Sequence, residues 1–305
     1  MLKMVIAKPL YRPLKLEILY YLSIRIKLSS NEKQYYLNLK KGYEGEREFA
    51  SWLKDLSDNY IILYDVLLEH NNSLFQIDAL VLTPTIVYLF EIKNYEGDFY
   101  IESDIWYTST GNEIKNPILQ LRRCESALRS FLQSCGYTLP INSHVVFTNS
   151  EFALFQAPRN QPIILPAQRN RFIKDLNMNA PHSKNYTLAK QFMSAHLQQS
   201  PYNLAPKFDY NSLKKGIICA TCGAFLSPTK NVQFVCEHCG HKEKIDTSIL
   251  RSIREFEILF PNKKITTNII YNWCKIIYSK KTIRRILSKN YMIVGHGKAA
   301  HYVPK

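Results

Sequence analysis

Three residues in the first half of the chain, Asp78, Glu91 and Lys93, have types and spacing that suit metal-dependent chemistry. Asp78 lies in the apolar run FQIDALVL, and the other two lie in YLFEIKNY. Because residues i and i+2 of a strand point to the same face, Glu91 and Lys93 would share a face while Ile92 points the other way. Two carboxylates beside a lysine are the groups that metal-assisted hydrolysis of a phosphodiester requires.

Two predicted strands joined by a short turn would bring these side chains together. A two-residue turn at residues 84–85 would pair Leu80 with Leu89 and set Asp78 opposite Glu91. The alternative interpretation of Glu-x-Lys is an exposed ion pair at a sheet edge. Asp78 argues against that alternative, because a carboxylate inside an apolar strand needs a metal ion or another partner.

The segments around this hairpin alternate between helical and strand patterns. Residues 11–40 look helical, and a second helix is expected to start near Gly42 with apolar residues at spacings of three and four. Asn116 and Pro117 form a cap and a first-turn proline for a helix that extends to about residue 134, and the strand INSHVVFTN follows. This order predicts an α/β sandwich.

Four short motifs occur in order along residues 40–150. They are GxxGE at residues 42–46, QID at 76–78, ExKN at 91–94 with Gly97 after it, and NPxxQ at 116–120. With these motifs the chain resembles the nuclease-related domain (NERD), a branch of the PD-(D/E)xK nuclease superfamily. The resemblance implies a restriction-endonuclease-like core, with a central mixed sheet flanked by helices, and a metal-dependent nuclease activity.

The residue types suit particular roles in such a site. Asp78 and Glu91 would hold Mg²⁺ or Mn²⁺ with water and a phosphate oxygen. Lys93 would either orient the attacking water or stabilise charge on the phosphate, with its pKa lowered if it is partly buried. Glu46, at the margin of its helix's apolar stripe, is an accessory ligand, and the Gln120 amide would point inward as a support. Gly42 and Gly45 are interpreted as helix-entry glycines.

Four of the seven cysteines form two CxxC pairs, CATC and CEHC, separated by 13 residues. Two such pairs can direct four thiolates at one tetrahedral Zn²⁺, so Cys219, Cys222, Cys236 and Cys239 predict a zinc ribbon with a structural zinc. Two disulfides or four free thiols are the alternatives, and His238 or His241 could replace a ligand. Zinc binding would contribute on the order of 10 kcal/mol to folding of this segment.

Residues 258–305 contain no Asp or Glu but many Lys and Arg. Three helical patterns and a hairpin turning at residues 295–297 resemble a winged helix-turn-helix. Ser279 would cap the third helix and its apolar side chains would pack inward, leaving basic residues to face DNA phosphates. These candidate nucleic-acid-binding residues are Lys280, Lys281, Arg284, Arg285 and Lys298, with His296 also on the wing. A solvated helical subdomain is the alternative.

The composition agrees with an anionic partner. The chain has 305 residues, a net charge of +15 and a pI near 9.4, an excess typical of nucleic-acid binding. Charged residues and prolines interrupt the apolar stretches of residues 1–27, so we expect neither a signal peptide nor a membrane span, and a cytoplasmic location. The leading hypothesis is an Mg²⁺-dependent deoxyribonuclease. The alternatives are a non-catalytic DNA-binding or regulatory protein on a nuclease-like scaffold, and an RNA-directed protein.

The same patterns predict the domain organisation. We expect an N-terminal helical segment at residues 1–40, a nuclease-like domain at 41–200, a linker at 201–215, the zinc ribbon at 216–243 and the basic winged-helix-like module at 246–305.

Overall fold

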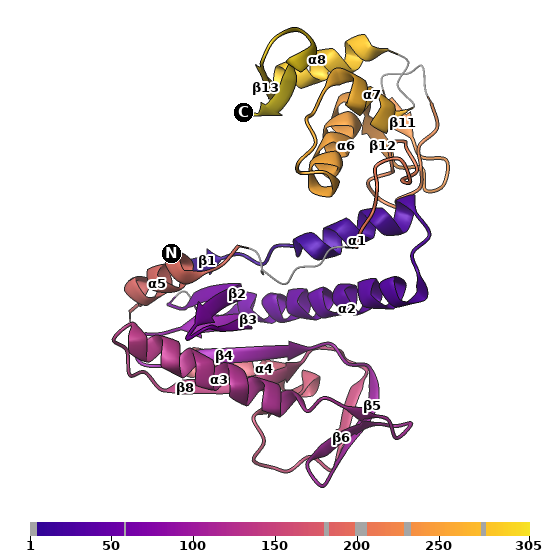
Figure 1. The fold of residues 1–305 in the computed structure, drawn as a ribbon. Helices are drawn as coiled ribbons and strands as arrows, with labels where there is room; N and C mark the ends of the chain where they lie inside the picture. The colour runs from indigo at the N-terminus through magenta and orange to yellow at the C-terminus, as the bar shows by residue number, and fades with distance from the viewer. Residues whose placement is uncertain (1–4, 58, 180–182, 199–205, 229–232, 276–278) are drawn as a thin grey trace. The chain divides into compact units, whose positions relative to one another are not determined.

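The computed structural model describes residues 5–57, 59–179, 183–198, 206–228, 233–275 and 279–305. The chain divides into two compact units (Figure 1). Unit 1 comprises Met1–Arg12 and Leu37–Asn203, and unit 2 comprises Pro13–Tyr36 and Leu204–Lys305. No helix among the described residues has the length and apolar character needed to cross a bilayer.

A six-stranded mixed sheet forms the centre of unit 1, with the order β1-β2-β3-β4-β8-β10. Strands β2, β3 and β4 pair antiparallel, whereas β1, β8 and β10 join their neighbours in parallel. The strands of this sheet are β1 (Val5–Lys8), β2 (Ile61–His70), β3 (Ser73–Leu82), β4 (Val87–Lys93), β8 (Ile141–Phe147) and β10 (Ile163–Ile164).

Helices cover both faces of this sheet. One face packs with α3 (Pro117–Ser134) and α5 (Tyr186–Ala195), and the other packs with α2 (Ser30–Trp52) and α4 (Arg169–Met178). Figure 1 shows α3 lying along β4 and β8. Short 3-10 turns, η1 (Leu53–Asp55) and η2 (Pro166–Gln168), follow α2 and precede α4. The mixed α/β class with a central mixed sheet is confirmed.

A second, four-stranded sheet extends from the core of unit 1, with the order β7-β6-β5-β9. Its strands are β5 (Gly97–Glu102), β6 (Ile105–Thr108), β7 (Glu113–Ile114) and β9 (Phe152–Phe155). One face packs on the main core through Phe99, Trp106 and Phe152. Ser103 and Asp104, with positive φ, form the tight turn between β5 and β6.

The N-terminal segment differs from the expectation of a helical stretch at residues 1–40. Strand β1 pairs with β2 at the edge of the sheet, α1 (Leu14–Arg25) belongs to unit 2, and the boundary between the units falls within α2. A four-residue segment such as VIAK is too short for periodicity to distinguish a strand from a helix.

Helix α2 also begins earlier than predicted. It starts at Ser30 and continues through Gly42, so the interpretation of Gly42 and Gly45 as helix-entry glycines is wrong. The real start has a reciprocal cap, because Ser29 Oγ accepts from the N–H of Glu32 (3.3 Å) and Glu32 Oε2 accepts from the N–H of Ser29 (2.8 Å). The sequence pattern Ser-x-x-Glu at residues 29–32 is typical of this reciprocal cap.

Unit 2 has one core that the zinc segment, the C-terminal helices and α1 share. Its other elements are β11 (Gln233–Val235), β12 (Lys242–Lys244), α6 (Ile245–Leu259), α7 (Thr267–Cys274), α8 (Lys280–Asn290), β13 (Tyr291–Val294), η3 (Gly297–Ala299) and β14 (His301–Pro304). Leu213 is buried in this core and Phe208 and Tyr210 pack against it. Residues 206–215, expected as linker, are therefore part of unit 2, and residues 201–205 lie outside the described residues.

Candidate nuclease site and zinc site

Strands β3 and β4 place Asp78 and Glu91 where their ladder ends. Leu80 pairs with Leu89 as predicted, and the last ladder pair in this direction is Ala79 with Phe90. Beyond that pair, β3 continues with β2 and β4 continues with β8. Asp78 Oδ2 accepts a 2.7 Å hydrogen bond from the backbone N–H of Ile92, which fixes the carboxylate beside β4.

Lys93 connects Glu91 to helix α3. Its Nζ lies 2.7 Å from Glu91 Oε1 and 3.0 Å from Gln120 Oε1. Glu91 is buried, whereas Gln120 is exposed on the first turns of the helix that Asn116 caps, which differs from the prediction that its amide points inward. The structure thus brings together three residues that belong to the separate motifs ExKN and NPxxQ.

The expected lowering of the Lys93 pKa is wrong. Burial alone would lower the pKa of Lys93, but the charge and hydrogen bond of Glu91 outweigh this effect and raise it. Lys93 is therefore a protonated cation at neutral pH, able to donate to an anion but not to accept a proton.

Glu46 is a third carboxylate near this pair. Burial, together with the charges of Asp65 and Glu91, raises the pKa of Glu46 to about 7. Burial and the charges of Glu91 and Glu46 likewise raise the pKa of Asp78 well above its ordinary range. Burial and the neighbouring Glu91 charge therefore disfavour the ionised forms of Glu46 and Asp78.

These carboxylates fit a divalent cation by chemistry. Oxygen ligands suit Mg²⁺ and Mn²⁺, and a bound cation would offset the burial and the repulsion that together raise both pKa values. The group is looser than a complete ligand shell. Among the residues that the structure describes, only the four clustered cysteines form a set of three or more ligand-type side chains with all ligand atoms within 4.8 Å.

Two residues near the site, Lys8 and Asp65, were not predicted from the sequence. Asp65 lies in β2 with a positive φ of 51°, and its Oδ1 accepts a 2.6 Å hydrogen bond from Gln76 Nε2. Lys8 is buried in β1, and its Nζ donates to the carbonyl oxygens of Tyr64 and Asp65. A lysine in a short apolar run and an aspartate in a long strand were the available hints.

The four predicted zinc ligands lie together in unit 2. Cys219 Sγ is 3.7 Å from Cys239 Sγ, and Cys222 Sγ is 3.6 Å from Cys236 Sγ. Sulfurs around a tetrahedral Zn²⁺, at about 2.3 Å from the metal, are about 3.8 Å apart. No disulfide joins any of these four cysteines in the structure.

Each CxxC pair forms the same tight turn. The N–H of Gly223 donates to the Cys219 carbonyl (3.1 Å), and the N–H of Gly240 donates to the Cys236 carbonyl (2.8 Å). Both glycines have positive φ, 74° and 73°, which favours glycine at this position. Strands β11 and β12 pair beside the second turn. The cysteine cluster supports the predicted zinc ribbon.

The basic C-terminal segment forms three helices and a hairpin, β13 and β14. Ser279 caps α8, and Ile283, Ile286 and Leu287 are buried.

The predicted DNA-binding residues of this segment differ in their surroundings. Lys280, Lys281 and Arg284 are exposed, whereas both terminal nitrogens of Arg285 bind Asp246, at 2.9 and 2.6 Å. The side chain of Lys298 lies outside the described part of the structure.

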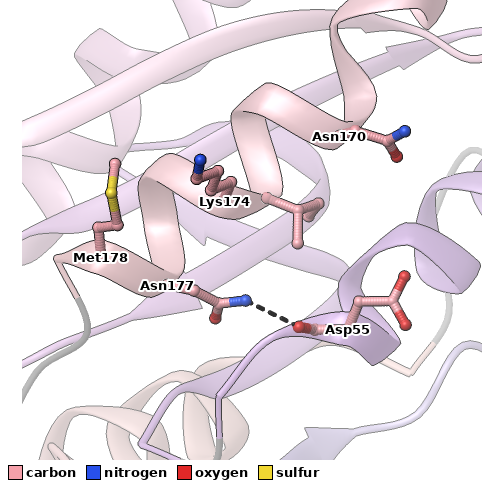
Figure 2. Close-up of a pocket in the computed structure, with 6 residues that line it drawn as sticks. Asp55, Asn170, Lys174, Asn177 and Met178 are labelled. Atoms are coloured by element: carbon pink, nitrogen blue, oxygen red, sulfur yellow. Dashed lines mark hydrogen bonds between the residues drawn. The ribbon is translucent and has the colours of Figure 1, made fainter.

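A pocket of about 460 Å³ lies elsewhere in unit 1, between η1 and α4. Figure 2 shows the Asn177 amide donating to the backbone carbonyl of Asp55 at its edge, at 2.9 Å. None of its lining residues belongs to the predicted site, so we assign no role to it.

The comparison with protein families agrees with this geometry. Residues 41–148 match the family model of the nuclease-related domain (NERD), which confirms the resemblance for about a third of the chain. This segment contains all five predicted catalytic residues. The chain has no significant match among curated proteins or among solved structures.

Proposed function

We propose that this chain is a metal-dependent nuclease of the PD-(D/E)xK type that hydrolyses phosphodiester bonds in DNA. The observation that carries the proposal is the placement of Asp78 and Glu91 at the end of one strand ladder, with Lys93 held between Glu91 and Gln120. A nuclease-related domain whose three charged motif residues meet at one place supports a retained site.

Asp78 and Glu91 would hold Mg²⁺ or Mn²⁺, with Glu46 as an accessory ligand. Such an ion lowers the pKa of bound water and neutralises phosphate charge. The Lys93 ammonium would donate to a phosphate oxygen on which negative charge develops. Gln120 would help to orient Lys93 through their 3.0 Å hydrogen bond.

In this proposal, unit 2 supplies DNA binding. The zinc is structural, because four cysteines close its coordination shell. The segment from α6 to β14 acts as a winged-helix-like module, in which the exposed Lys280, Lys281 and Arg284 contact phosphates.

The test is cleavage of linear, nicked, branched and single-stranded DNA with Mg²⁺ or Mn²⁺. Asp78→Ala, Glu91→Ala and Lys93→Ala should each reduce the rate at least about 100-fold, while DNA binding persists. Glu96→Ala is the matched control, since Glu96 lies three residues beyond Lys93 and is exposed in an ion pair with Lys41. Absence of cleavage of every substrate by the wild type would reject the enzyme hypothesis.

The second candidate is a non-catalytic DNA-binding protein that keeps the scaffold. The exposed basic residues of α8 favour it, because they need no metal site to bind phosphate. It predicts salt-dependent DNA binding that Asp78→Ala leaves unchanged, in a protein that cuts neither DNA nor RNA.

A further inference from the structure

Lys8 makes a specific set of contacts in unit 1 although it lies outside the segment that matches the nuclease-related domain. It is 7% exposed. Its Nζ donates to the carbonyl oxygens of Tyr64 (2.9 Å) and Asp65 (2.7 Å), and lies 3.7 Å from Asp65 Oδ2. Burying an ammonium is costly, and burial lowers the pKa of Lys8. The two carbonyls and the Asp65 carboxylate are the partners that offset this cost.

The two carbonyls lie at the point in β2 where the regular alternation of side chains between the two faces of the sheet is interrupted. In a regular strand alternate residues point to opposite faces. Yet Leu63 and Val66, three residues apart, both belong to the core on the α3 side, whereas Tyr64 belongs to the core on the α2 side. The alternation therefore shifts by one residue at Asp65, whose φ of 51° marks the irregularity.

In strand β3 the alternation of side chains is interrupted at the position opposite Asp65. Ile77 and Leu80, also three residues apart, both belong to the core on the α3 side, and Ala79 belongs to the other. Since Tyr64 pairs with Ala79 and Val66 with Ile77, the residue opposite Asp65 is Asp78. The two shifts are in register, and the candidate metal ligand Asp78 occupies one of them.

We propose that Lys8 is a positioning residue of the carboxylate site, which holds the shift at Asp65 and thereby keeps Asp78 beside Glu91. The inference rests on the proposed function. The ammonium binds the two carbonyls on either side of the shift, and Asp65 in turn binds Gln76, two residues before Asp78. Strand β1 thus completes the site from outside the matched segment.

The charge of Lys8 determines in which direction metal binding should change when Lys8 is replaced. Removing a positive charge near carboxylates strengthens cation binding on electrostatic grounds alone. A loss of positioning has the opposite effect, because Asp78 and Glu91 would no longer be held together. A weaker metal response in a neutral variant therefore reports on geometry.

The experiment measures Mn²⁺-induced stabilisation of the full chain without DNA, followed by kinetics of DNA cleavage. In Lys8→Met the Mn²⁺-induced rise in the unfolding midpoint should fall to less than half of the wild-type value. Because a misplacement of about 1 Å can reduce turnover 100-fold, we expect kcat to fall at least about 10-fold with KM nearly unchanged. Lys54→Met, at an exposed lysine of η1, is the matched control and should behave as wild type.

The outcomes separate this inference from the proposed function. An Mn²⁺ response in Lys8→Met equal to or larger than the wild-type response overturns the positioning role and leaves the nuclease proposal standing. A wild type that neither responds to Mn²⁺ nor cuts DNA overturns both. Should Lys8→Met not fold, the same comparison is made with Lys8→Gln, which is also neutral but keeps an N–H donor, and a response equal to that of the wild type again overturns the positioning role.

Discussion

Gly45 of helix α2 lies so close to Asn94, just past the end of β4, that a β-carbon at position 45 would stand 2.7 Å from the Asn94 β-carbon. Asn94 also donates from Nδ2 to the Lys41 carbonyl of the same helix, at 2.7 Å. These contacts bring the helix that carries Glu46 against the strand that carries Glu91. Gly45, the second glycine of the GxxGE motif, thus permits a close approach of helix and sheet.

Two glycines of α2 provide a matched test of this contact. Gly45→Ala should destabilise unit 1, because the added carbon meets Asn94 and, at 3.2 Å, Thr148 Oγ1. Gly42→Ala should stabilise the protein by up to about 1 kcal/mol, since nothing lies within 4 Å of its added carbon and alanine favours a helix. Thermal unfolding measures both, and equal effects of the two variants would contradict the packing role.

The Glu46 pKa of about 7 predicts a pH-dependent stability in the absence of divalent metal. The native state binds this proton more tightly than the unfolded chain, whose Glu pKa is about 4.3. Stability from this group is therefore present at low pH and lost as pH rises through 7. Glu46→Gln should be more stable than wild type at pH 8, by at most about 4 kcal/mol, with no gain at pH 4.

The exposed neighbour Glu44 supplies the control for this prediction, because it lies on the same helix in an ion pair with Lys40. Glu44→Gln should show no such pH-dependent gain in denaturant unfolding. A Glu46→Gln variant that matches wild type at every pH would show that Glu46 is not destabilised when ionised.

Arg25 of α1 should be essential for the stability of unit 2. Its guanidinium binds Glu255 at 2.6 and 2.9 Å, donates to two backbone carbonyls and lies 4.0 Å from the Trp273 ring centre. Both side chains are fully buried. Arg25→Ala should cost about 3–5 kcal/mol, because it leaves a buried carboxylate without its partner.

A second arginine–carboxylate pair in unit 2 is exposed and serves as the control. Arg285 and Asp246 form a two-point ion pair at the surface, so Arg285→Ala should leave the unfolding midpoint almost unchanged. Comparable losses in Arg25→Ala and Arg285→Ala, measured by denaturant unfolding, would refute the claim that α1 anchors unit 2.

The cysteine cluster should bind one zinc ion per chain, measurable by elemental analysis. Cys236→Ser should abolish zinc binding and destabilise unit 2, because Cys236 is also buried in the core that α6 shares. Cys135→Ser, at a half-buried thiol of unit 1, should retain the metal. Full zinc occupancy in Cys236→Ser would disprove the four-cysteine site.

Helix α8 should contact DNA through Lys281 and Arg284 more than through Arg285. The first two are exposed, whereas Arg285 is already neutralised by Asp246. Each lost phosphate contact lowers the slope of log K against log salt by about 0.9. Fluorescence anisotropy across salt concentrations should show this for Lys281→Ala and Arg284→Ala. A larger loss in Arg285→Ala would contradict the structure.

The register of the central hairpin could be predicted because a two-residue turn leaves one pairing of two short strands. Leu80 therefore meets Leu89, and Asp78 and Glu91 follow. The cap at Asn116 and the two CxxC turns were predictable for the same reason, since neighbouring residues determine each of them.

Contacts between distant segments were not predictable in this way. No local pattern connects Lys8 with Asp65, or Arg25 with Glu255, because residues 57 and 230 positions apart meet only after the core has formed. The interrupted alternation of side chains at Asp65 could not be predicted from the sequence for a similar reason. Both halves of β2 are apolar, and the pattern does not show which face each side chain meets.

The amino-acid sequence by itself determined the local arrangement of the candidate residues, through ordered motifs that place Asp78, Glu91 and Lys93 within one hairpin and four cysteines in two turns. Only the tertiary structure decided which contacts between distant segments support these residues. Gln120 of α3 binds Lys93, Lys8 of β1 binds the backbone at Asp65, and Arg25 of α1 binds Glu255 within unit 2. The reason is that turns and strand register are local properties, whereas the placement of helices and edge strands depends on burial across the whole chain.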